Sequence, residues 1–365
     1  MKLSISKPEL SSAVGMVIRA TASRPSVPAL SGILITADGG SLTLYASDLE
    51  TSIKTSANGL VEENGSIVVP GRIFSDIVRS LPESSVTLET DGEILNISCG
   101  QSHFTIHTLN VGDFTKFPEI TGIDGVSLPG NVLSSMVRKV IRSVSRDETR
   151  AILTGILLTV EGAVVRMVAT DSYRLSLVEQ YLDEPAADNF EVLVPGRAFD
   201  EVVKMAAGAA AVNLSLSSNQ VSFSFGDTVF VTRRLEGNFP NYRQLIPKEW
   251  KVRATANHSE LLDSVKRVSL MAPNNASIKF AVSETDQTLV ASSRSQELGD
   301  ANESLMVKVE GGDGEISFNH SFVQDGLAAI ESEFVTLEMT EAVKPGILRS
   351  AEENFLYLMM PVRPS

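Results

Sequence analysis

The chain repeats one stretch of its own sequence, and this repeat constrains the fold more than any other feature. Residues 69–79, which begin Val-Pro-Gly-Arg, return as residues 194–204, 125 positions later. The same offset brings Gly112-Asp113-Phe114 onto Gly237-Asn238-Phe239. An offset that holds from position 69 to position 114 indicates that a whole module was duplicated, because chance similarity would not keep one spacing over that length.

A third, fainter copy of the module follows. Phe74 and Phe199 have a candidate counterpart in Phe322. A second set of matching segments is Ala46-Ser47-Asp48, Ala169-Thr170-Asp171 and Ala291-Ser292-Ser293. Three modules of about 122 residues fill the 365 residues, and each has the size of a single-core domain. We therefore predict three similar domains in tandem, at residues 1–121, 122–248 and 249–365.

The composition is that of a globular protein. Hydrophobic residues make up 43% of the chain and charged residues 21%, which is enough apolar material to build cores. No apolar run reaches the length of a membrane span, about 18 residues, and the alternating start of the sequence is unlike a signal peptide. Cys99 is the only cysteine, so there is no disulfide framework and no cysteine-based zinc site. We expect a cytoplasmic protein with no membrane partner, no cofactor and no metal.

The pattern of apolar residues predicts an α+β fold. Segments such as Ser41–Ala46, Val86–Thr90 and Ile94–Ser98 alternate with period two, which indicates half-buried antiparallel strands separated by glycine-rich turns. Two stretches in each module repeat instead at helical spacing. The predicted helices are 8–19, 72–81, 130–146, 197–206, 259–269 and 320–331. About two helices among about eight strands in each module favour helices packed on one face of a sheet.

Charge is divided unevenly between the two kinds of element. The six predicted helices carry formal charges of 0, +1, +4, 0, 0 and −2, a total of +3, whereas the whole chain carries −14. All other residues therefore carry −17. Arg138, Lys139, Arg142 and Arg146 form a basic stripe on the helix predicted at 130–146. A solvated helix face would explain this stripe by itself, but the contrast with the acidic remainder favours a surface that faces a polyanion.

Three separated motifs, together with the triple repeat, resemble one known family. The motifs are Ala-Thr-Asp-Ser-Tyr-Arg-Leu at 169–175, Phe-Pro-Asn-Tyr-Arg at 239–243 and Tyr-Leu-Met-Met-Pro-Val-Arg at 357–363. With the Val-Pro-Gly-Arg helix openings, they resemble the bacterial DNA polymerase III beta subunit family, the replicative sliding clamps. The resemblance covers the whole chain, and the combination is specific although each motif by itself is weak.

The resemblance implies the DNA clamp (processivity) fold, three tandem domains in each subunit of a head-to-tail homodimeric ring. Antiparallel sheets would lie outside, and helices would line a hole that encloses duplex DNA without reading its sequence. This arrangement would explain the charge division, because helices that face phosphates need a positive bias. The residues implied to face DNA are Arg24, Arg72, Arg79, Arg138, Lys139, Arg142, Arg197, Lys204, Lys266 and Arg267.

The resemblance also implies a hydrophobic pocket that binds short peptides ending in Leu or Phe. These peptides would come from the DNA polymerase III alpha subunit, the clamp loader and other clamp-binding-motif proteins. Apolar Leu, Met and Pro side chains suit such a surface, although Met359-Met360-Pro361 also reads as an ordinary terminal core strand. The implied residues are Arg150, Leu153, Thr170, Ser172, Tyr173, Arg174, Leu175, Pro240, Gln244, Leu245, Val343, Pro345, Leu358, Met359, Met360, Pro361, Val362 and Arg363.

Ring closure implies a contact between the first domain of one subunit and the third domain of its partner. The matching positions in this chain are Phe104, Ile106, Leu270 and Met271. Two positions depart from the family pattern in the pocket. Tyr173 stands where many members have His, and Gln244 where several have a basic residue, so peptide preference can differ.

Two other functions, an enzyme and a protein-only scaffold, fit the sequence less well. An enzyme needs a catalytic set, but the four histidines are scattered, and no phosphate-binding loop, dinucleotide fingerprint or nucleophile elbow is present. Asp48 and Asp171 recur at equivalent positions, which favours a turn or helix-cap role over catalysis. A scaffold that binds only proteins is the other alternative, and the division of charge speaks against it.

Overall fold

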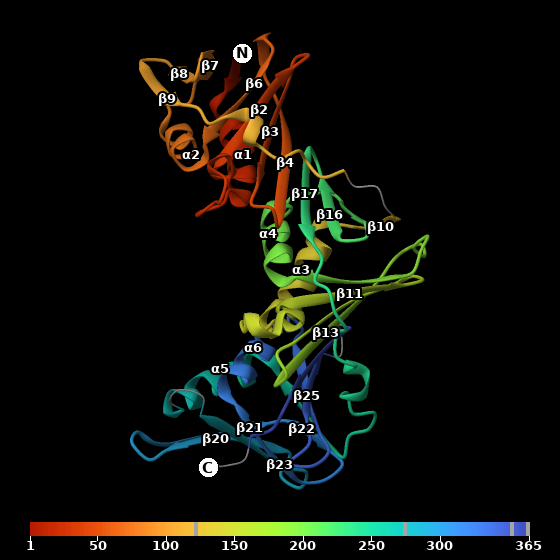
Figure 1. The fold of residues 1–365 in the computed structure, drawn as a ribbon. Coiled ribbons are helices and arrows are strands. Elements are labelled where there is room, and N and C mark those ends of the chain that lie inside the picture. The colour runs from red at the N-terminus through yellow and green to blue at the C-terminus, as the bar shows by residue number, and fades with distance from the viewer. Residues whose placement is uncertain (120–122, 273–275, 351–353, 363–365) are drawn as a thin grey trace. The chain divides into compact units, whose positions relative to one another are not determined.

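The structure, a computed structural model shown in Figure 1, describes residues 1–119, 123–272, 276–350 and 354–362. The chain divides into two compact units that do not follow the repeats. The first comprises Met1–Leu133 and Glu201–Arg234, and the second Ser134–Asp200 and Leu235–Ser365. The middle repeat is therefore shared between the units. The described residues contain no helix long and apolar enough to cross a membrane.

Six α-helices form in the described part of the chain, all within the predicted ranges or close to them. They are α1 (Lys7–Val17), α2 (Gly71–Ser80), α3 (Gly130–Val140), α4 (Gly196–Met205), α5 (His258–Val268) and α6 (His320–Leu327). The prediction for α3 was too long, because the chain passes through a short 3₁₀ turn at Ile141–Ser143 and then leaves the helix. There the Ser143 hydroxyl bonds the Ser176 hydroxyl at 2.6 Å. The last predicted turns are therefore a 3₁₀ turn and extended chain rather than α-helix.

The first unit contains two antiparallel sheets. The five-stranded sheet has the order β5 (Leu60–Glu63), β1 (Lys2–Ser6), β7 (Ser85–Asp91), β8 (Ile94–Cys99), β9 (Ser102–His107). The eight-stranded sheet has the order β10 (Ile123–Leu128), β15 (Val212–Leu216), β16 (Gln220–Phe225), β17 (Thr228–Arg233), β4 (Thr51–Asn58), β3 (Ser41–Ser47), β2 (Gly32–Asp38), β6 (Gly65–Pro70). Helices α1 and α2 pack together, and α1 also packs on β4 (Figure 1). The pairing of β17 with β4 joins the first two repeats in one sheet.

The second unit also contains two antiparallel sheets. The nine-stranded sheet has the order β14 (Phe190–Pro195), β11 (Gly155–Glu161), β12 (Val164–Thr170), β13 (Arg174–Tyr181), β26 (Phe355–Met359), β25 (Gly346–Ser350), β24 (Phe334–Met339), β18 (Val252–Asn257), β22 (Lys308–Glu310). The four-stranded sheet has the order β21 (Gly299–Met306), β20 (Thr288–Ser295), β19 (Ser277–Ser283), β23 (Gly314–Asn319). Here β13 pairs with β26, so the second and third repeats also share a sheet.

The repeated Val-Pro-Gly-Arg motif is a strand that runs directly into a helix. Strands β6 and β14 end at the proline, and α2 and α4 begin at the glycine. A Cβ atom on Gly71 would lie 2.9 Å from the Ser31 carbonyl oxygen, and one on Gly196 would lie 3.0 Å from Val144 Cγ1. Close packing of neighbouring segments therefore leaves little room for a side chain at either position.

The third repeat uses different residues for the same junction. Asn319 caps α6, and its side chain accepts a hydrogen bond from the Ser321 amide at 2.9 Å. Val323 is buried three residues after the start of α6, as Phe74 and Phe199 are in α2 and α4. The predicted match of Phe322 to these phenylalanines is therefore wrong by one residue, since Val323 takes the core position.

The recurring aspartates form turns, as predicted. The Asp48 carboxylate accepts hydrogen bonds from the amides of the second and third residues after it, at 3.0 and 2.6 Å. The Asp171 carboxylate does the same, at 2.9 and 3.0 Å. The residues between, Leu49 and Ser172, have positive φ angles of 75° and 81°. The aspartate side chain stabilises this strained turn in both repeats, whereas in the third repeat β20 continues to Ser295.

Candidate functional site

The predicted peptide-binding residues of the second unit gather around one apolar cluster. Its buried members are Leu157, Val168, Leu175, Leu193, Tyr242, Ile347, Leu356 and Leu358. Strand pairing sets Arg174 opposite Met359 and Leu175 opposite Leu358. The pairing continues past β26, because the Met360 amide donates to the Tyr173 carbonyl oxygen at 2.8 Å. Two motifs about 185 positions apart in the sequence thus form one structure.

Four large apolar side chains around this cluster are exposed to solvent: Tyr173, Leu245, Val343 and Met360. Pro240, Gln244 and Leu245 flank Tyr242, which is buried in the cluster. Val343 and Pro345 lead into β25, whose first residue pairs with Met359. Exposed apolar side chains that rise from a packed apolar base are typical of a protein–protein contact surface. We call these four residues and the cluster beneath them the apolar surface.

Some predicted pocket residues are buried and have no exposed side chain at the apolar surface. The residues Leu153, Thr170, Leu175, Leu358 and Met359 are buried. The Thr170 hydroxyl donates to the Arg174 carbonyl oxygen at 2.7 Å, so it is occupied within the turn. Pro361 and Val362 are half-buried, and the Val362 amide donates to the Ser317 carbonyl oxygen at 2.9 Å. Arg363 lies outside the described residues.

Arg174 is the most restrained cation of this region. Its guanidinium donates to Asp171 Oδ2 at 3.0 Å and to Asp325 Oδ2 at 2.6 Å, and it lies 3.2 Å from the Tyr357 hydroxyl. Its Cζ atom is 4.5 Å from the centre of the Phe322 ring. Burial by itself would lower the pKa of Arg174, but Tyr357 and the two carboxylates raise it above the ordinary arginine value. The side chain is therefore a fixed cation at the base of the Asp171 turn.

Arg150 is held differently, at the edge of the same turn. Its guanidinium donates to Asp147 Oδ2 at 2.8 Å and to the Ser172 hydroxyl at 3.1 Å. Hydrogen bonds from Thr149 and Arg150 hold the pKa of Asp147 below its usual value. Arg150 is exposed, so it remains accessible to a ligand.

The predicted DNA-facing residues are exposed, with one exception. The exposed residues are Arg24, Arg72, Arg79, Arg138, Arg142, Arg197, Lys204, Lys266 and Arg267. Lys139 is only 9% exposed, and its ammonium lies 5.9 Å from the centre of the Phe355 ring. It follows the buried Met136 by three residues, so it lies on the packed side of α3 and does not belong to the basic stripe.

The exposed cations differ in their access to a phosphate. Arg138, Arg142, Lys204, Lys266 and Arg267 each have a carboxylate within 4 Å, at distances from 2.7 to 3.9 Å. Within the described ranges, no carboxylate pairs with Arg24, Arg72, Arg79 or Arg197. Arg72 and Arg197 occupy the same position in their repeats, one residue after the start of α2 and α4. The repeated motif thus presents an unpaired guanidinium twice.

The predicted interface residues lie on exposed or half-buried surface. Phe104 and Ile106 alternate along β9, the outermost strand of the five-stranded sheet, and both are half-buried. Leu270 is exposed, and Met271 is half-buried in the turn after α5. An outermost strand with apolar side chains can pair with another chain.

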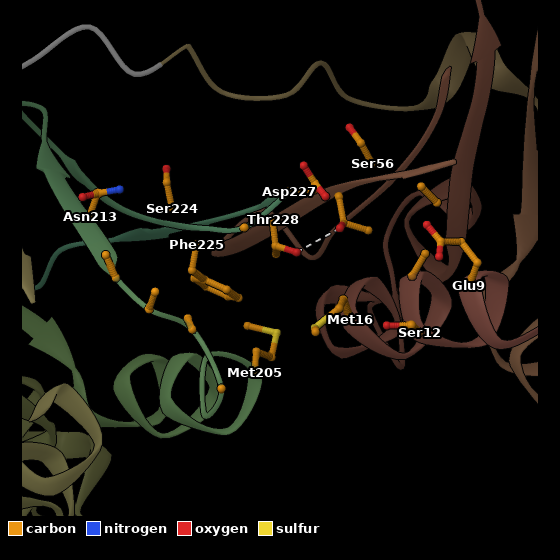
Figure 2. Close-up of a pocket in the computed structure, with 18 residues that line it drawn as sticks. Glu9, Ser12, Met16, Ser56, Met205, Asn213, Ser224, Phe225, Asp227 and Thr228 are labelled. Atoms are coloured by element: carbon orange, nitrogen blue, oxygen red, sulfur yellow. Dashed lines mark hydrogen bonds between the residues drawn. The ribbon is translucent and has the colours of Figure 1, made fainter. Parts of the chain in front are cut away.

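A cavity of about 650 Å³ in the first unit contains no residue that the sequence singled out. Figure 2 shows Met16, Met205 and Phe225 close together on one side of it, with Glu9 and Asp227 among the polar residues around them. It is formed by residues of α1, β4, β16 and the end of α4. Because these segments are far apart in the sequence, no local motif predicts the cavity. Its lining is part polar and part apolar, and no predicted site residue contributes to it.

The fold is that of a repeat protein with α+β domains, and the surfaces described above are of the kind that bind other molecules. Among the described residues, no group of three or more His, Cys, Asp or Glu side chains could hold a metal ion. The role of Asp48 and Asp171 in turns explains why these carboxylates recur, without a catalytic role.

The chain belongs to the DNA polymerase III beta subunit family, whose members are non-catalytic sliding clamps. The family's N-terminal, central and C-terminal domains match residues 1–118, 127–241 and 243–363. The chain is 33% identical to the beta sliding clamp of Streptomyces coelicolor and 31% identical to that of Bacillus subtilis, over 100% of both chains in each case.

Solved structures agree with this assignment. The sliding clamp of Bacillus subtilis superposes with a TM-score of 0.95 at 30% identity, over 100% of both chains. The sliding clamp of Pseudomonas aeruginosa bound to griselimycin has a TM-score of 0.94 at 26% identity, over 100% of this chain and 99% of that one. The predicted α+β fold of three tandem clamp domains is confirmed.

Proposed function

We propose that this chain acts as a sliding clamp in DNA replication, a processivity factor that encloses duplex DNA and tethers the replicative polymerase to it. The observation that carries this proposal is the pair of unpaired arginines, Arg72 and Arg197, at equivalent positions of a chain with a net charge of −14. In an acidic protein that repels DNA elsewhere, guanidiniums kept free of carboxylates on the equivalent helices of two repeats favour contact with phosphates.

Enclosure removes the need for strong contacts. A closed ring stays on DNA because it surrounds it, so a few exposed cations are sufficient to guide the duplex. Such contacts are sensitive to salt and independent of sequence, and they break easily enough to permit sliding. The exposed residues Arg24 and Arg79, which also have no carboxylate partner among the described residues, would add to those of the repeated motif.

Ring closure requires a second copy of the chain. We propose a head-to-tail homodimer in which β9, with Phe104 and Ile106, meets Leu270 and Met271 of the partner. The exposed position of Leu270 and the outermost position of β9 support this contact. The contact would cover an apolar side chain and a free strand edge that would otherwise favour aggregation.

The apolar surface is the proposed site for partner peptides. Exposed Tyr173, Leu245, Val343 and Met360 would receive the Leu or Phe end of a peptide, and Arg150 would meet its polar groups. We propose that the polymerase alpha subunit, the clamp loader and other clamp-binding-motif proteins compete for this surface. Action on replicating bacterial DNA would place the protein in the cytoplasm, and we keep 1–121, 122–248 and 249–365 as the domain boundaries.

The proposed function is tested by retention on nicked circular DNA after loading. A ring is retained on the circle and is lost when the circle is cut, whereas a protein-only scaffold shows no such dependence. A companion assay for nuclease or phosphatase activity with magnesium or manganese examines the enzyme alternative. Activity that Asp171→Ala abolishes, or retention that linearisation does not change, would overturn the proposal.

The role of the repeated arginines is tested by equilibrium binding to a short labelled duplex over a range of salt. Arg72→Ala with Arg197→Ala should reduce the slope of log affinity against log salt by about two, since each phosphate contact contributes about 0.9. Arg234→Ala with Arg294→Ala removes two exposed arginines that are not among the predicted DNA-facing residues, and it serves as the control with matched charge. An unchanged slope in the double variant would exclude these arginines as phosphate contacts.

A further inference from the structure

One carboxylate joins the basic helix surface to the base of the peptide surface. Asp325, on α6, accepts a hydrogen bond from Arg142 at Oδ1, at 2.7 Å, and one from Arg174 at Oδ2, at 2.6 Å. Arg142 is a predicted DNA-facing residue and Arg174 a predicted peptide-binding residue. Both oxygens of Asp325 are therefore used, each for a different surface.

The two arginines are held to different degrees. The Arg174 side chain is 12% exposed and has three further contacts, with Asp171, Tyr357 and the Phe322 ring. The Arg142 side chain is 50% exposed, and among the described residues Asp325 is the one carboxylate that pairs with it. A ligand can therefore draw Arg142 away from Asp325 far more easily than it can draw Arg174.

The face of α6 explains how Asp325 reaches both. Phe322 and Asp325 are three residues apart, so they lie on the same side of the helix. Phe322 stacks on the Arg174 guanidinium while Asp325 accepts its hydrogen bond. This side of α6 therefore serves to fix Arg174, and the second oxygen of Asp325 is left for Arg142.

We propose that Asp325 is a positioning residue shared by the two surfaces: it fixes Arg174 beneath the peptide surface and restrains Arg142 from DNA phosphates. The inference rests on the proposed function, because it needs both ligands. It predicts that loss of the Asp325 charge has opposite effects on the two ligands. A merely structural role would weaken binding of both.

The test is Asp325→Asn, assayed with two probes. One is a labelled synthetic peptide that carries a Gln and a Leu-Phe end, and the other is a short labelled duplex titrated over a range of salt. Peptide affinity should fall on the order of ten-fold, because a charge-assisted hydrogen bond that orients Arg174 is lost. The salt slope of duplex binding should steepen by about 0.9, because Arg142 becomes free to contact a phosphate.

Two further variants give the test its controls. Glu50→Gln removes the same charge from a pair with Arg233 at 3.8 Å, and it should change neither the peptide affinity nor the salt slope. Arg142→Gln does not depend on the folding of the Asp325 variant. It should reduce the salt slope by clearly less than Arg72→Ala does, since Arg72 has no carboxylate to hold it back.

The outcomes separate this inference from the proposed function. If the unaltered protein binds neither probe, the proposed function fails. If it binds both and Asp325→Asn leaves peptide affinity and salt slope unchanged, or lowers both, Asp325 is not a shared positioning residue. An effect of Arg142→Gln equal to that of Arg72→Ala would also overturn the inference.

Discussion

A methyl group added to Gly326 of α6 should destabilise the protein, whereas the same change at Gly15 of α1 should stabilise it. A Cβ atom on Gly326 would lie 2.4 and 2.5 Å from two carbon atoms of the Tyr357 ring. Tyr357 has no exposed surface, so its ring cannot move aside into solvent. At Gly15 no atom lies within 4 Å of the added Cβ.

The magnitudes follow from two opposing effects. Replacing glycine by alanine within a helix stabilises it by at most about 1 kcal/mol, because alanine loses less backbone entropy on folding. Overpacking a full core costs about 1–3 kcal/mol, sometimes more. The short contacts with Tyr357 place the cost at Gly326 at the upper end of this range, about 2–3 kcal/mol, so the net result for Gly326→Ala is a loss of about 1–2 kcal/mol. For Gly15→Ala the net result is a gain of up to about 1 kcal/mol.

Thermal unfolding followed by circular dichroism measures both changes. A domain-sized unit shifts its midpoint by about 2–4 °C per kcal/mol, so Gly326→Ala should lower the relevant transition by roughly 2–8 °C. Because the Tyr357 hydroxyl contacts Arg174, peptide affinity should fall as well. A Gly326→Ala protein as stable as the original, or a destabilised Gly15→Ala protein, would refute the reasoning.

Three further predictions concern assembly, the peptide surface and pH. Phe104→Arg places a charge in the proposed interface and should give monomers in sedimentation, so a persistent dimer would count against the interface. Deletion of residues 360–365 should abolish peptide binding while the dimer persists, and undiminished affinity in a titration would exclude the apolar surface. Burial lowers the pKa of His320 below its ordinary value of 6.5, so the unfolded chain takes up the proton first. The stability of the folded protein should therefore fall as the pH drops below about 6.5 and through the lower pKa of the folded state. His320→Gln should make this fall in the unfolding midpoint smaller. An equal fall in the variant would exclude His320 as its cause.

The helices and strands could be predicted from the period of their apolar residues, because each element buries the face on which those residues recur. The helix starts at Gly71 and Gly196 could be predicted from the repeated motif. The turn role of the recurring aspartates could be predicted from their equivalent positions in two repeats. The end of α3 at Val140 could not be predicted, because the chain continues there as a 3₁₀ turn in which Ser143 bonds the distant Ser176, and the sequence does not show that contact. The burial of Lys139 was missed for a related reason, since a stripe of charges does not reveal which member turns inward.

The candidate site was only partly visible in the sequence. Resemblance supplied Arg174, but the residues that fix it, Phe322 and Asp325, lie about 150 positions away on another repeat. The sequence shows that Phe322 and Asp325 are three residues apart, but only the folded chain shows that this side of the helix faces Arg174. The cavity around Met16 and Phe225 was missed because four separate segments form it.

The strand pairs β17–β4 and β13–β26 make the repeats poor units for dissection. Excising the last repeat would strip β13 of its neighbour and leave the backbone groups of Arg174–Val178 unsatisfied along a new edge. A truncation intended to isolate one repeat would therefore yield a fragment that aggregates through its exposed strand edge. Protein engineers who wish to shuffle clamp modules would do better to cut within a connecting loop and carry each strand together with the neighbour it bonds.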